Sequence, residues 1–250
     1  LFFVTRKGVV KKTAFNAYDS SRSDGLIAIG LRDGDELVRV LPTSGGDDLL
    51  VVTRDGKGIR FSEENVRAMG RTASGVRGIR LLGDDLVVGA GAVKSDDDVL
   101  LTVTDRGFGK RTSMDNFTRR GRGGQGVRAH RLPADRGVLV NGFLVEPDDD
   151  VLMITDGGVV IRTSVDDISI QGRDASGVRV MHPGESNRVA AVARVLASDP
   201  DEDDAEDGSP DSGGPSIGEH GDGDAGDGDR SGEATDEAAA GGEIQGDEQD

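Results

Sequence analysis

The sequence predicts an all-β protein made of four repeated four-stranded blades, followed by a disordered acidic tail. Three observations predict it: an internal repeat of about fifty residues, short apolar runs separated by turn residues, and a change of composition near residue 199. No copy of the repeat contains a convincing amphipathic helix, since residues 63–69 would form only a turn or two. The expected blades cover about residues 1–48, 49–99, 100–150 and 151–198, and the expected tail covers residues 199–250.

Two sets of residues define the register of the repeat. A threonine followed three residues later by a glycine recurs at spacings of 48, 51 and 51. These pairs are Thr5 and Gly8, Thr53 and Gly56, Thr104 and Gly107, and Thr155 and Gly158. A second glycine recurs at spacings of 50, 51 and 51, and in the last three copies Val-Arg follows it directly. This second set is Gly25, Gly75, Gly126 and Gly177.

The order of elements is the same in every copy. An apolar run ends at the threonine, a turn follows, and a short segment then ends in a basic residue. A glycine-containing loop, the Gly-Val-Arg segment and a valine-rich run, such as residues 86–93 or 138–145, complete the copy. Each copy therefore predicts four short strands. Blades around an axis leave only short, protected edges, whereas a pair of β-sandwiches is the alternative.

Charge is distributed unevenly along the chain. Residues 199–250 contain 20 Asp or Glu and one Arg, a net charge of −19, whereas residues 1–198 have a net charge of +2. The tail has almost no large apolar residue, so it is expected to be disordered. Such a tail is either a solvated extension with no role or a polyanion that competes with DNA for the arginines of the body. Of the 30 basic residues in the chain 24 are arginines, so the overall charge of −17 does not exclude DNA as a partner of the body.

Several classes of protein are disfavoured by composition. Without cysteine there is no disulfide and no Cys-ligated zinc, which fits a reducing cytoplasm. No apolar stretch is long enough for a membrane helix, and the apolar start at residues 1–4 is too short for a signal peptide. The chain begins with Leu1 rather than Met, so we interpret it as part of a longer protein.

The sequence predicts no catalytic residue and no metal site. His130, His182 and His220 occupy unrelated positions of the repeat, and no triad or ligand cluster is apparent. The aspartate runs at residues 96–98 and 148–150 lack the ligand spacing of a calcium loop and are interpreted as solvated turns. Residues 121–126 match Gly-x-Gly-x-x-Gly, but a strand rather than a helix is expected next, so dinucleotide binding is rejected.

Basic residues recur from copy to copy, which favours binding to a nucleic acid. The densest stretch is residues 119–126, where three arginines alternate with flexible glycines that allow close approach to phosphates. Bending a duplex around such a series costs about 1 to 6 kcal/mol, so many contacts are needed. The predicted binding is independent of base sequence and strongly salt-dependent. The candidate DNA-binding residues are Lys12, Arg60, Arg71, Arg77, Arg111, Arg119, Arg120, Arg122, Arg128, Arg162, Arg173 and Arg179.

Residues 47–82, with Thr-Arg-Asp-Gly-Lys-Gly-Ile-Arg-Phe and Ala-Ser-Gly-Val-Arg-Gly-Ile-Arg-Leu, closely resemble the C-terminal domain of the DNA gyrase A protein. Residues 8–13, 27–29, 34–37, 109–112 and 168–173 are also similar to that family, and the resemblance covers residues 1–198 in order. It implies a β-pinwheel, the last four of six blades, that wraps double-stranded DNA. It further implies a cytoplasmic, chromosome-associated type IIA topoisomerase that introduces negative supercoils using ATP and Mg²⁺, in which two gyrase A proteins assemble with two gyrase B proteins.

The resemblance leaves two alternatives open. The family's diagnostic box, Gln-Arg-Arg-Gly-Gly-Lys/Arg-Gly, belongs to a first blade that this chain lacks, and residues 119–126 are a blade-level analogue of it. The C-terminal domain of the A-type protein of topoisomerase IV, which uses the same fold, is therefore an alternative. A non-catalytic propeller-like module that recruits proteins is the second alternative.

Overall fold

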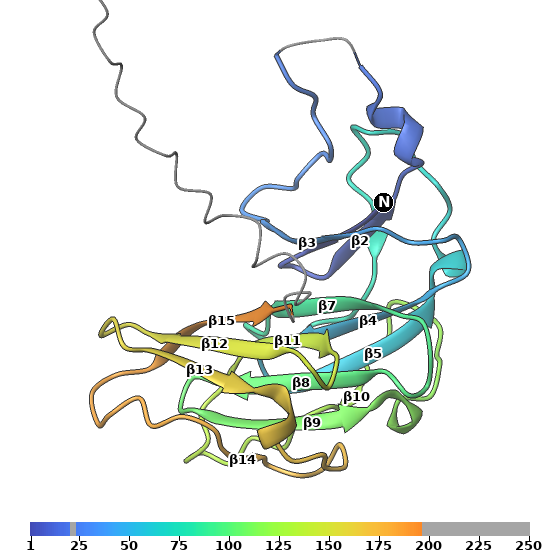
Figure 1. Ribbon diagram of the computed structural model, residues 1–250. Coiled ribbons are helices and arrows are strands. Elements are labelled where there is room, and N and C mark those ends of the chain that lie inside the picture. Colours follow the sequence, from blue (N-terminus) through green and yellow to red (C-terminus); the bar gives the residue numbers. More distant parts are fainter. Residues whose placement is uncertain (21–23, 197–250) are drawn as a thin grey trace, which may run out of the picture. The chain divides into compact units, whose positions relative to one another are not determined.

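The computed structural model describes residues 1–20 and 24–196 (Figure 1). The predicted tail at residues 199–250 lies outside the described residues. The regular secondary structure of the described part consists of strands and single-turn 3-10 helices, which confirms the all-β prediction. The strands are β1 (Phe2–Thr5), β2 (Val9–Lys12), β3 (Leu37–Leu41), β4 (Asp48–Thr53), β5 (Lys57–Ser62), β6 (Val76–Arg77), β7 (Val87–Val93), β8 (Val99–Thr104), β9 (Phe108–Ser113), β10 (Val127–Arg128), β11 (Leu139–Val145), β12 (Asp150–Thr155), β13 (Val160–Ser164), β14 (Val178–Arg179) and β15 (Val189–Val195). The 3-10 helices are η1 (Phe15–Tyr18), η2 (Glu63–Asn65), η3 (Met114–Asn116) and η4 (Val165–Asp167).

The strands form four antiparallel sheets, one for each copy of the repeat. Their strand orders are β3-β1-β2-β6, β10-β5-β4-β7, β11-β8-β9-β14 and β13-β12-β15. The blade architecture predicted from the repeat is therefore confirmed.

The fourth strand of each four-stranded sheet comes from the following copy of the repeat. The two-residue strands β6, β10 and β14, which we call the exchanged strands, pair with β2, β5 and β9 of the preceding copy. The sequence predicted the Val-Arg strands but placed each within its own copy. Among the described residues the last sheet has only three strands, because no following copy supplies a fourth.

The recurring spacing of threonine and glycine has a local cause in the hairpin turns. In the β1–β2 turn the Thr5 carbonyl accepts the N–H of Gly8 at 3.0 Å, and the Thr5 hydroxyl accepts the N–H of Val9 at 3.1 Å. The same pair of bonds recurs at Thr53, Thr104 and Thr155. Gly8 has a φ of 77°, a conformation that glycine adopts without steric cost.

The second glycine of the repeat marks the point where an exchanged strand crosses to its neighbour. A side chain at Gly126 would overlap the backbone carbonyl of Gly58 in the preceding copy, and Gly75 and Gly177 are equally confined. Gly25, in the first copy, has the same positive φ but no atom near its missing side chain. The confinement therefore accompanies strand exchange, and it is absent at Gly25, which no described sheet precedes.

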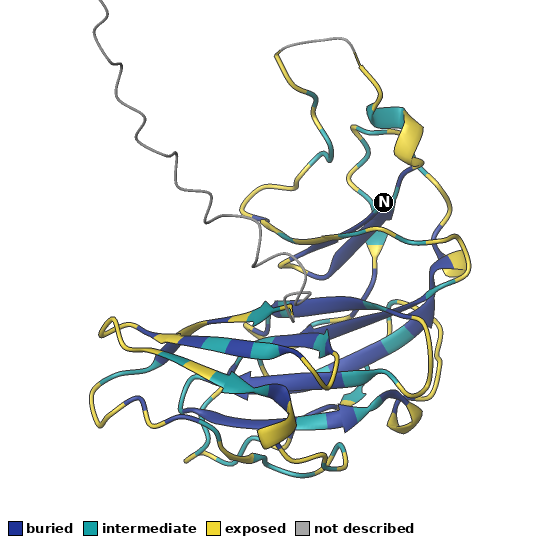
Figure 2. Cartoon of the chain, in the orientation of Figure 1, coloured by how far each residue is buried: buried dark blue, intermediate teal, exposed yellow. Residues whose placement is uncertain are grey.

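The hydrophobic cores lie between successive sheets. All six residues of β4 are buried, with Leu49 and Val51 in one core and Leu50 and Val52 in the next. Because successive side chains of a strand point to opposite faces, a continuous apolar run is expected for a strand covered on both sides. Figure 2 shows these buried central strands and the exposed loops around them. In β12 of the last sheet Val151 and Met153 are buried, but Ile154 is exposed.

The strands at the edge opposite to the exchanged strands contact one another. β3 contacts β7, β7 contacts β11, and β11 contacts β15. A side chain at Gly89 of β7 would overlap the backbone of Gly142 in β11, so these two strands approach closely. The two edges of each four-stranded sheet are thus distinct: an inner edge packed against other inner edges, and an outer edge formed by an exchanged strand.

Candidate nucleic-acid interface

Three predicted arginines lie on the outer edges of successive sheets. Arg77, Arg128 and Arg179 are the second residues of β6, β10 and β14, and all three are exposed. Each is placed by pairing with the preceding copy, opposite Val9, Lys57 and Phe108 respectively. Strand exchange therefore produces one outward arginine per sheet, at the edge farthest from the inner strands.

A second arginine of each glycine-containing loop joins this outer row. Arg122 donates from a guanidinium nitrogen to the carbonyl oxygen of Arg77 at 3.0 Å, and Arg173 donates to the carbonyl oxygen of Arg128 at 3.1 Å. Arg71 makes the equivalent bond to Ile27 at 3.0 Å. The structure therefore places predicted residues from consecutive copies side by side.

Two buried lysines hold the loops that carry these arginines. Lys110, in β9, has no exposed surface and donates to the carbonyl oxygens of Gly172 and Arg173 at 2.6 and 2.9 Å. Lys11, in β2, bonds the carbonyls of Ala28 and Arg71 in the same way. Burial lowers the pKa of Lys110 to about 8, and burial together with the charge of Arg71 lowers the pKa of Lys11. Isoleucines occupy the equivalent positions, Ile59 and Ile161.

Four other predicted residues lie in the second strand of each copy, and two of them, Arg60 and Arg111, bond segments of the following copy. Arg60 donates to the carbonyl of Met114 at 3.1 Å and pairs with Asp48 and Asp96 at 2.8 and 2.6 Å. Arg111 bonds the carbonyl of Asp166 at 3.2 Å and that residue's carboxylate at 2.8 Å. Only 12% and 11% of the Arg60 and Arg111 side chains are exposed. These contacts indicate a structural role for both arginines.

The exposure of the other two residues of this set, Lys12 and Arg162, also depends on whether a following sheet is present. Lys12 bonds the carbonyl of Glu63 at 3.1 Å and has 20% of its side chain exposed. Arg162, in the last sheet, pairs only with Asp150 among the described residues, at 2.6 Å, and 61% of its side chain is exposed. Since no later sheet follows within the described chain, Arg162 keeps the exposure that the other three lose.

The arginine- and glycine-rich stretch at residues 119–126 lies over the second sheet. Arg119 donates to the buried carboxylate of Asp48 at 3.0 Å, an acceptor it shares with Arg60. Arg120 is exposed, and its guanidinium has no partner among the described residues. Arg122 connects this stretch to the η2 turn, because its guanidinium donates to the carbonyl oxygen of Asn65 at 2.8 Å.

Sequence reasoning missed a further set of basic residue types three residues beyond the outer row. Arg80, Arg131 and His182 recur at spacings of 51 and are exposed. The same repeat scan that located Arg77 and Arg128 contained the signal for them. Arg106, near the start of the third copy, and Arg188, near the end of the fourth, were also missed, because neither recurs as an arginine in the other copies.

The described part of the chain has no group of three or more His, Cys, Asp or Glu that could hold a metal ion. No helix described is long and apolar enough to cross a membrane.

Strand-exchanged blades with arginines repeated along their outer edges define a repeat protein with a cationic perimeter. The chain belongs to the family described as the DNA gyrase C-terminal domain, beta-propeller, whose model matches residues 1–44, 47–94, 98–146 and 149–195. The resemblance found in the sequence is thereby confirmed.

Relatives and solved structures agree with this assignment. The chain is 43% identical to the DNA gyrase A protein of Salmonella typhimurium and 41% identical to that of Mycobacterium tuberculosis, over 84% of its own length in both comparisons. It spans only about a quarter of these relatives, 24% and 25%. A DNA topoisomerase IV C-terminal domain superposes with a TM-score of 0.74 at 30% identity, covering 78% of this chain and 61% of the other. A DNA gyrase A C-terminal domain gives 0.68 at 25% identity, covering 78% and 65%.

Proposed function

We propose that this chain binds double-stranded DNA along the outer edges of its sheets and wraps it, as the C-terminal part of a DNA gyrase A protein. The observation that carries the proposal is the row of exposed arginines, Arg77, Arg128 and Arg179, one on each exchanged strand. The family and the names of the relatives support the same function.

The chemistry of the row explains what kind of binding is expected. Guanidinium groups recognise phosphate oxygens, which are identical at every base pair, so binding is independent of base sequence. A duplex that follows contacts on successive sheets is bent, at a cost of about 1 to 6 kcal/mol for a site of 20 to 30 base pairs. Several sheets must act together to offset that cost. This requirement is consistent with a repeated arginine rather than a single basic loop.

The rest of the proposed activity belongs to a longer protein. We propose that wrapping supports ATP-dependent negative supercoiling by a cytoplasmic type IIA topoisomerase with two gyrase A and two gyrase B proteins. ATP and Mg²⁺ are assigned to other parts of that enzyme, and the described residues of this chain supply DNA contacts.

The proposal is tested by measuring the affinity of the chain for two duplexes of unrelated sequence over a range of salt concentrations. We expect equal affinities and a steep salt dependence. Replacing Arg77, Arg128 and Arg179 together by alanine should reduce the slope of log K against log[salt] by about 3, since each lost phosphate contact removes about 0.9. Salt-insensitive binding, or none at low salt, would argue instead for a protein-recruiting module.

Topoisomerase IV remains the competing assignment, favoured by the TM-score of its C-terminal domain. The coding sequence upstream of Leu1 separates the two. A Gln-Arg-Arg-Gly-Gly box in an earlier blade supports gyrase, and a cleavage domain without that box supports topoisomerase IV.

A further inference from the structure

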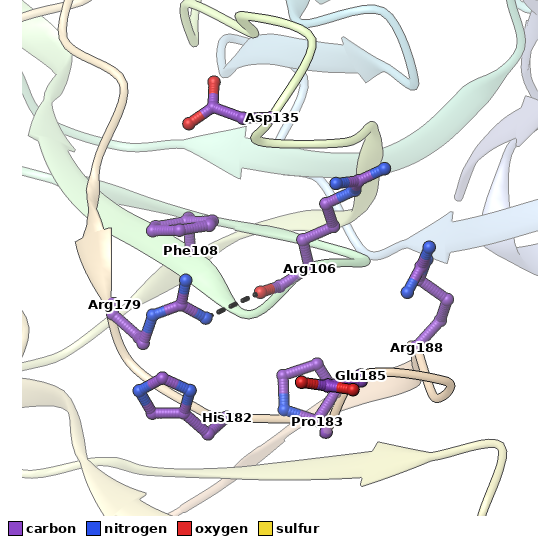
Figure 3. A pocket seen from close by; sticks show the side chains of 9 residues that line it. Arg106, Phe108, Asp135, Arg179, His182, Pro183, Glu185 and Arg188 are labelled. Atoms are coloured by element: carbon purple, nitrogen blue, oxygen red, sulfur yellow. Dashed lines mark hydrogen bonds between the residues drawn. The ribbon is translucent and has the colours of Figure 1, made fainter.

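A basic recess lies where the third and fourth copies of the repeat meet. It has a volume of about 320 Å³ and is lined by Arg106 of the β8–β9 turn, Arg179 of the exchanged strand β14, and His182 and Arg188 beyond it (Figure 3). The recess exists only because β14 crosses to the preceding sheet and brings these side chains to the β8–β9 turn.

The cations of the recess are largely free of acidic partners. Arg179 makes one weak bond, to the carbonyl of Arg106 at 3.3 Å, and no described carboxylate pairs with it. The guanidinium of Arg106 has no partner among the described residues. Arg188 lies 3.7 Å from a carboxylate oxygen of Asp105, a long ion pair. Two acids, Asp135 and Glu185, also line the recess, and Asp135 pairs with Arg136 at 3.5 Å.

Phe108 orients Arg179 without neutralising it. The guanidinium carbon of Arg179 lies 4.1 Å from the centre of the Phe108 ring, and that of Arg136 lies 3.9 Å from it. The ring is buried, with only 7% of the residue exposed. A guanidinium stacked on an aromatic face keeps its charge and its N–H donors for another ligand.

The preceding junction contains an equivalent recess in which the outer-row arginine is paired with an acid. Lys57, Arg128 and Arg131 stand there in place of Phe108, Arg179 and His182, around a volume of about 500 Å³. In that recess Arg128 pairs with Asp174 at 2.9 Å, and Asp55 is also in the lining. The architecture thus recurs from junction to junction, but the arginine on the exchanged strand lacks a carboxylate partner at the later junction and has one at the earlier junction.

We propose that the recess formed by Arg106, Arg179 and Arg188 binds a backbone phosphate of duplex DNA. This inference rests on the proposed function and adds Arg106 and Arg188 to the outer row as phosphate ligands. Three arginines from separate segments line a recess of about 320 Å³, and guanidinium forks match the oxygens of a phosphodiester group. The junction between copies, and not only the exchanged strand itself, then contacts the duplex.

The test compares three double variants of the whole chain in duplex binding over a salt series. In Arg106→Ala with Arg188→Ala, we expect about a tenfold or greater loss of affinity and a decrease of about 2 in the salt slope. Arg106→Lys with Arg188→Lys keeps the charge, so the slope should stay near that of the wild type while affinity falls, because lysine lacks the fork. Arg39→Ala with Lys94→Ala is the control. It removes two exposed charges on or next to the inner-edge strands β3 and β7 and should leave the slope unchanged.

The outcomes separate this inference from the proposed function. If the wild type binds DNA with a steep slope but the first variant matches either the wild type or the control, the recess is not a phosphate site. Equal loss in the lysine variant and the alanine variant would also overturn it, since that indicates structural damage. Binding of inorganic phosphate with unchanged duplex affinity would identify a small-anion site and overturn the assignment to DNA. Absence of duplex binding by the wild type would instead remove the proposed function.

Discussion

The first three sheets and the last sheet are built from the same repeat but differ at their outer edge. Each of the first three receives a strand from the following copy, whereas β13 of the last sheet has no such neighbour among the described residues. Side chains respond accordingly: Arg60 and Arg111 are largely buried in contacts with the next sheet, and Arg162 is exposed. A residue at this position of the repeat is therefore a buried contact between sheets only where a following copy is present, and it is exposed where none is.

The sharpest test of this comparison replaces the equivalent turn glycine in two sheets: the third sheet, which receives an exchanged strand, and the last sheet, which does not. Gly107→Ala would place its side chain against the carbonyl of Met181 in the crossing segment, whereas Gly158→Ala meets no atom nearby. Both glycines have a positive φ, 76° and 82°, so they share a conformational cost of about 1 to 2 kcal/mol. We expect more than about 3 kcal/mol of destabilisation at Gly107 and only about 1 at Gly158. Urea unfolding of both variants measures the difference. Equal losses would show that the crossing segment does not confine Gly107.

Acid should weaken the junction between the second and third sheets through His130. This side chain is buried behind the exchanged strand β10 and bonds the hydroxyl of Thr102 at 2.9 Å through Nδ1. Burial, aided by the charge of Lys110, lowers the pKa of His130 to about 4. The pKa of a histidine in the unfolded chain is near 6.5, so between about pH 6.5 and pH 4 the unfolded chain binds a proton at His130 that the folded chain does not bind. The free energy of unfolding should therefore fall as pH drops from about 6.5 to about 4, by on the order of 2 to 3 kcal/mol.

His130→Met isolates that contribution, because methionine is the natural residue at the equivalent position, Met181. The difference in unfolding free energy between the wild type and the variant should change across this pH range and stay flat above it. A difference that does not vary with pH would mean that His130 is protonated in the folded chain as readily as in the unfolded one.

A smaller effect is expected for the basic residues of the second strands. Arg111→Met removes bonds to the backbone and carboxylate of Asp166, and should destabilise the chain by about 1 to 2 kcal/mol. Arg162→Met removes an exposed ion pair and should cost less than about 0.5 kcal/mol. Thermal or urea unfolding distinguishes them. If Arg162 proves as important as Arg111, the following sheet is not what gives this position its structural role.

Much of the fold could be predicted because the repeat leaves a strong trace in the sequence. Thr53, Gly56 and their equivalents are required by one turn, and Leu49 to Val52 form a run that only a doubly covered strand explains. Strand exchange was not predictable, since a two-residue strand such as Val127 and Arg128 does not encode which sheet it joins. For the same reason the sequence grouped Arg60 and Arg111 with the exposed arginines. Arg106 and Arg188 were missed because the recess brings together residues that share no periodic position.

Strand exchange also has a consequence for how such a chain can change its length over generations. A gene duplication copies a sequence unit of about fifty residues. This unit does not coincide with a folded sheet, because every four-stranded sheet contains a two-residue strand from the next copy. Adding or deleting a copy leaves the sheets intact only when the two points that are joined occupy the same position within the repeat. Among the described residues the segment around Gly25 joins no preceding sheet, and β13 receives no strand from a later copy. The position within the repeat at which copies are joined, rather than the sequence of any single blade, therefore limits how the number of blades can change.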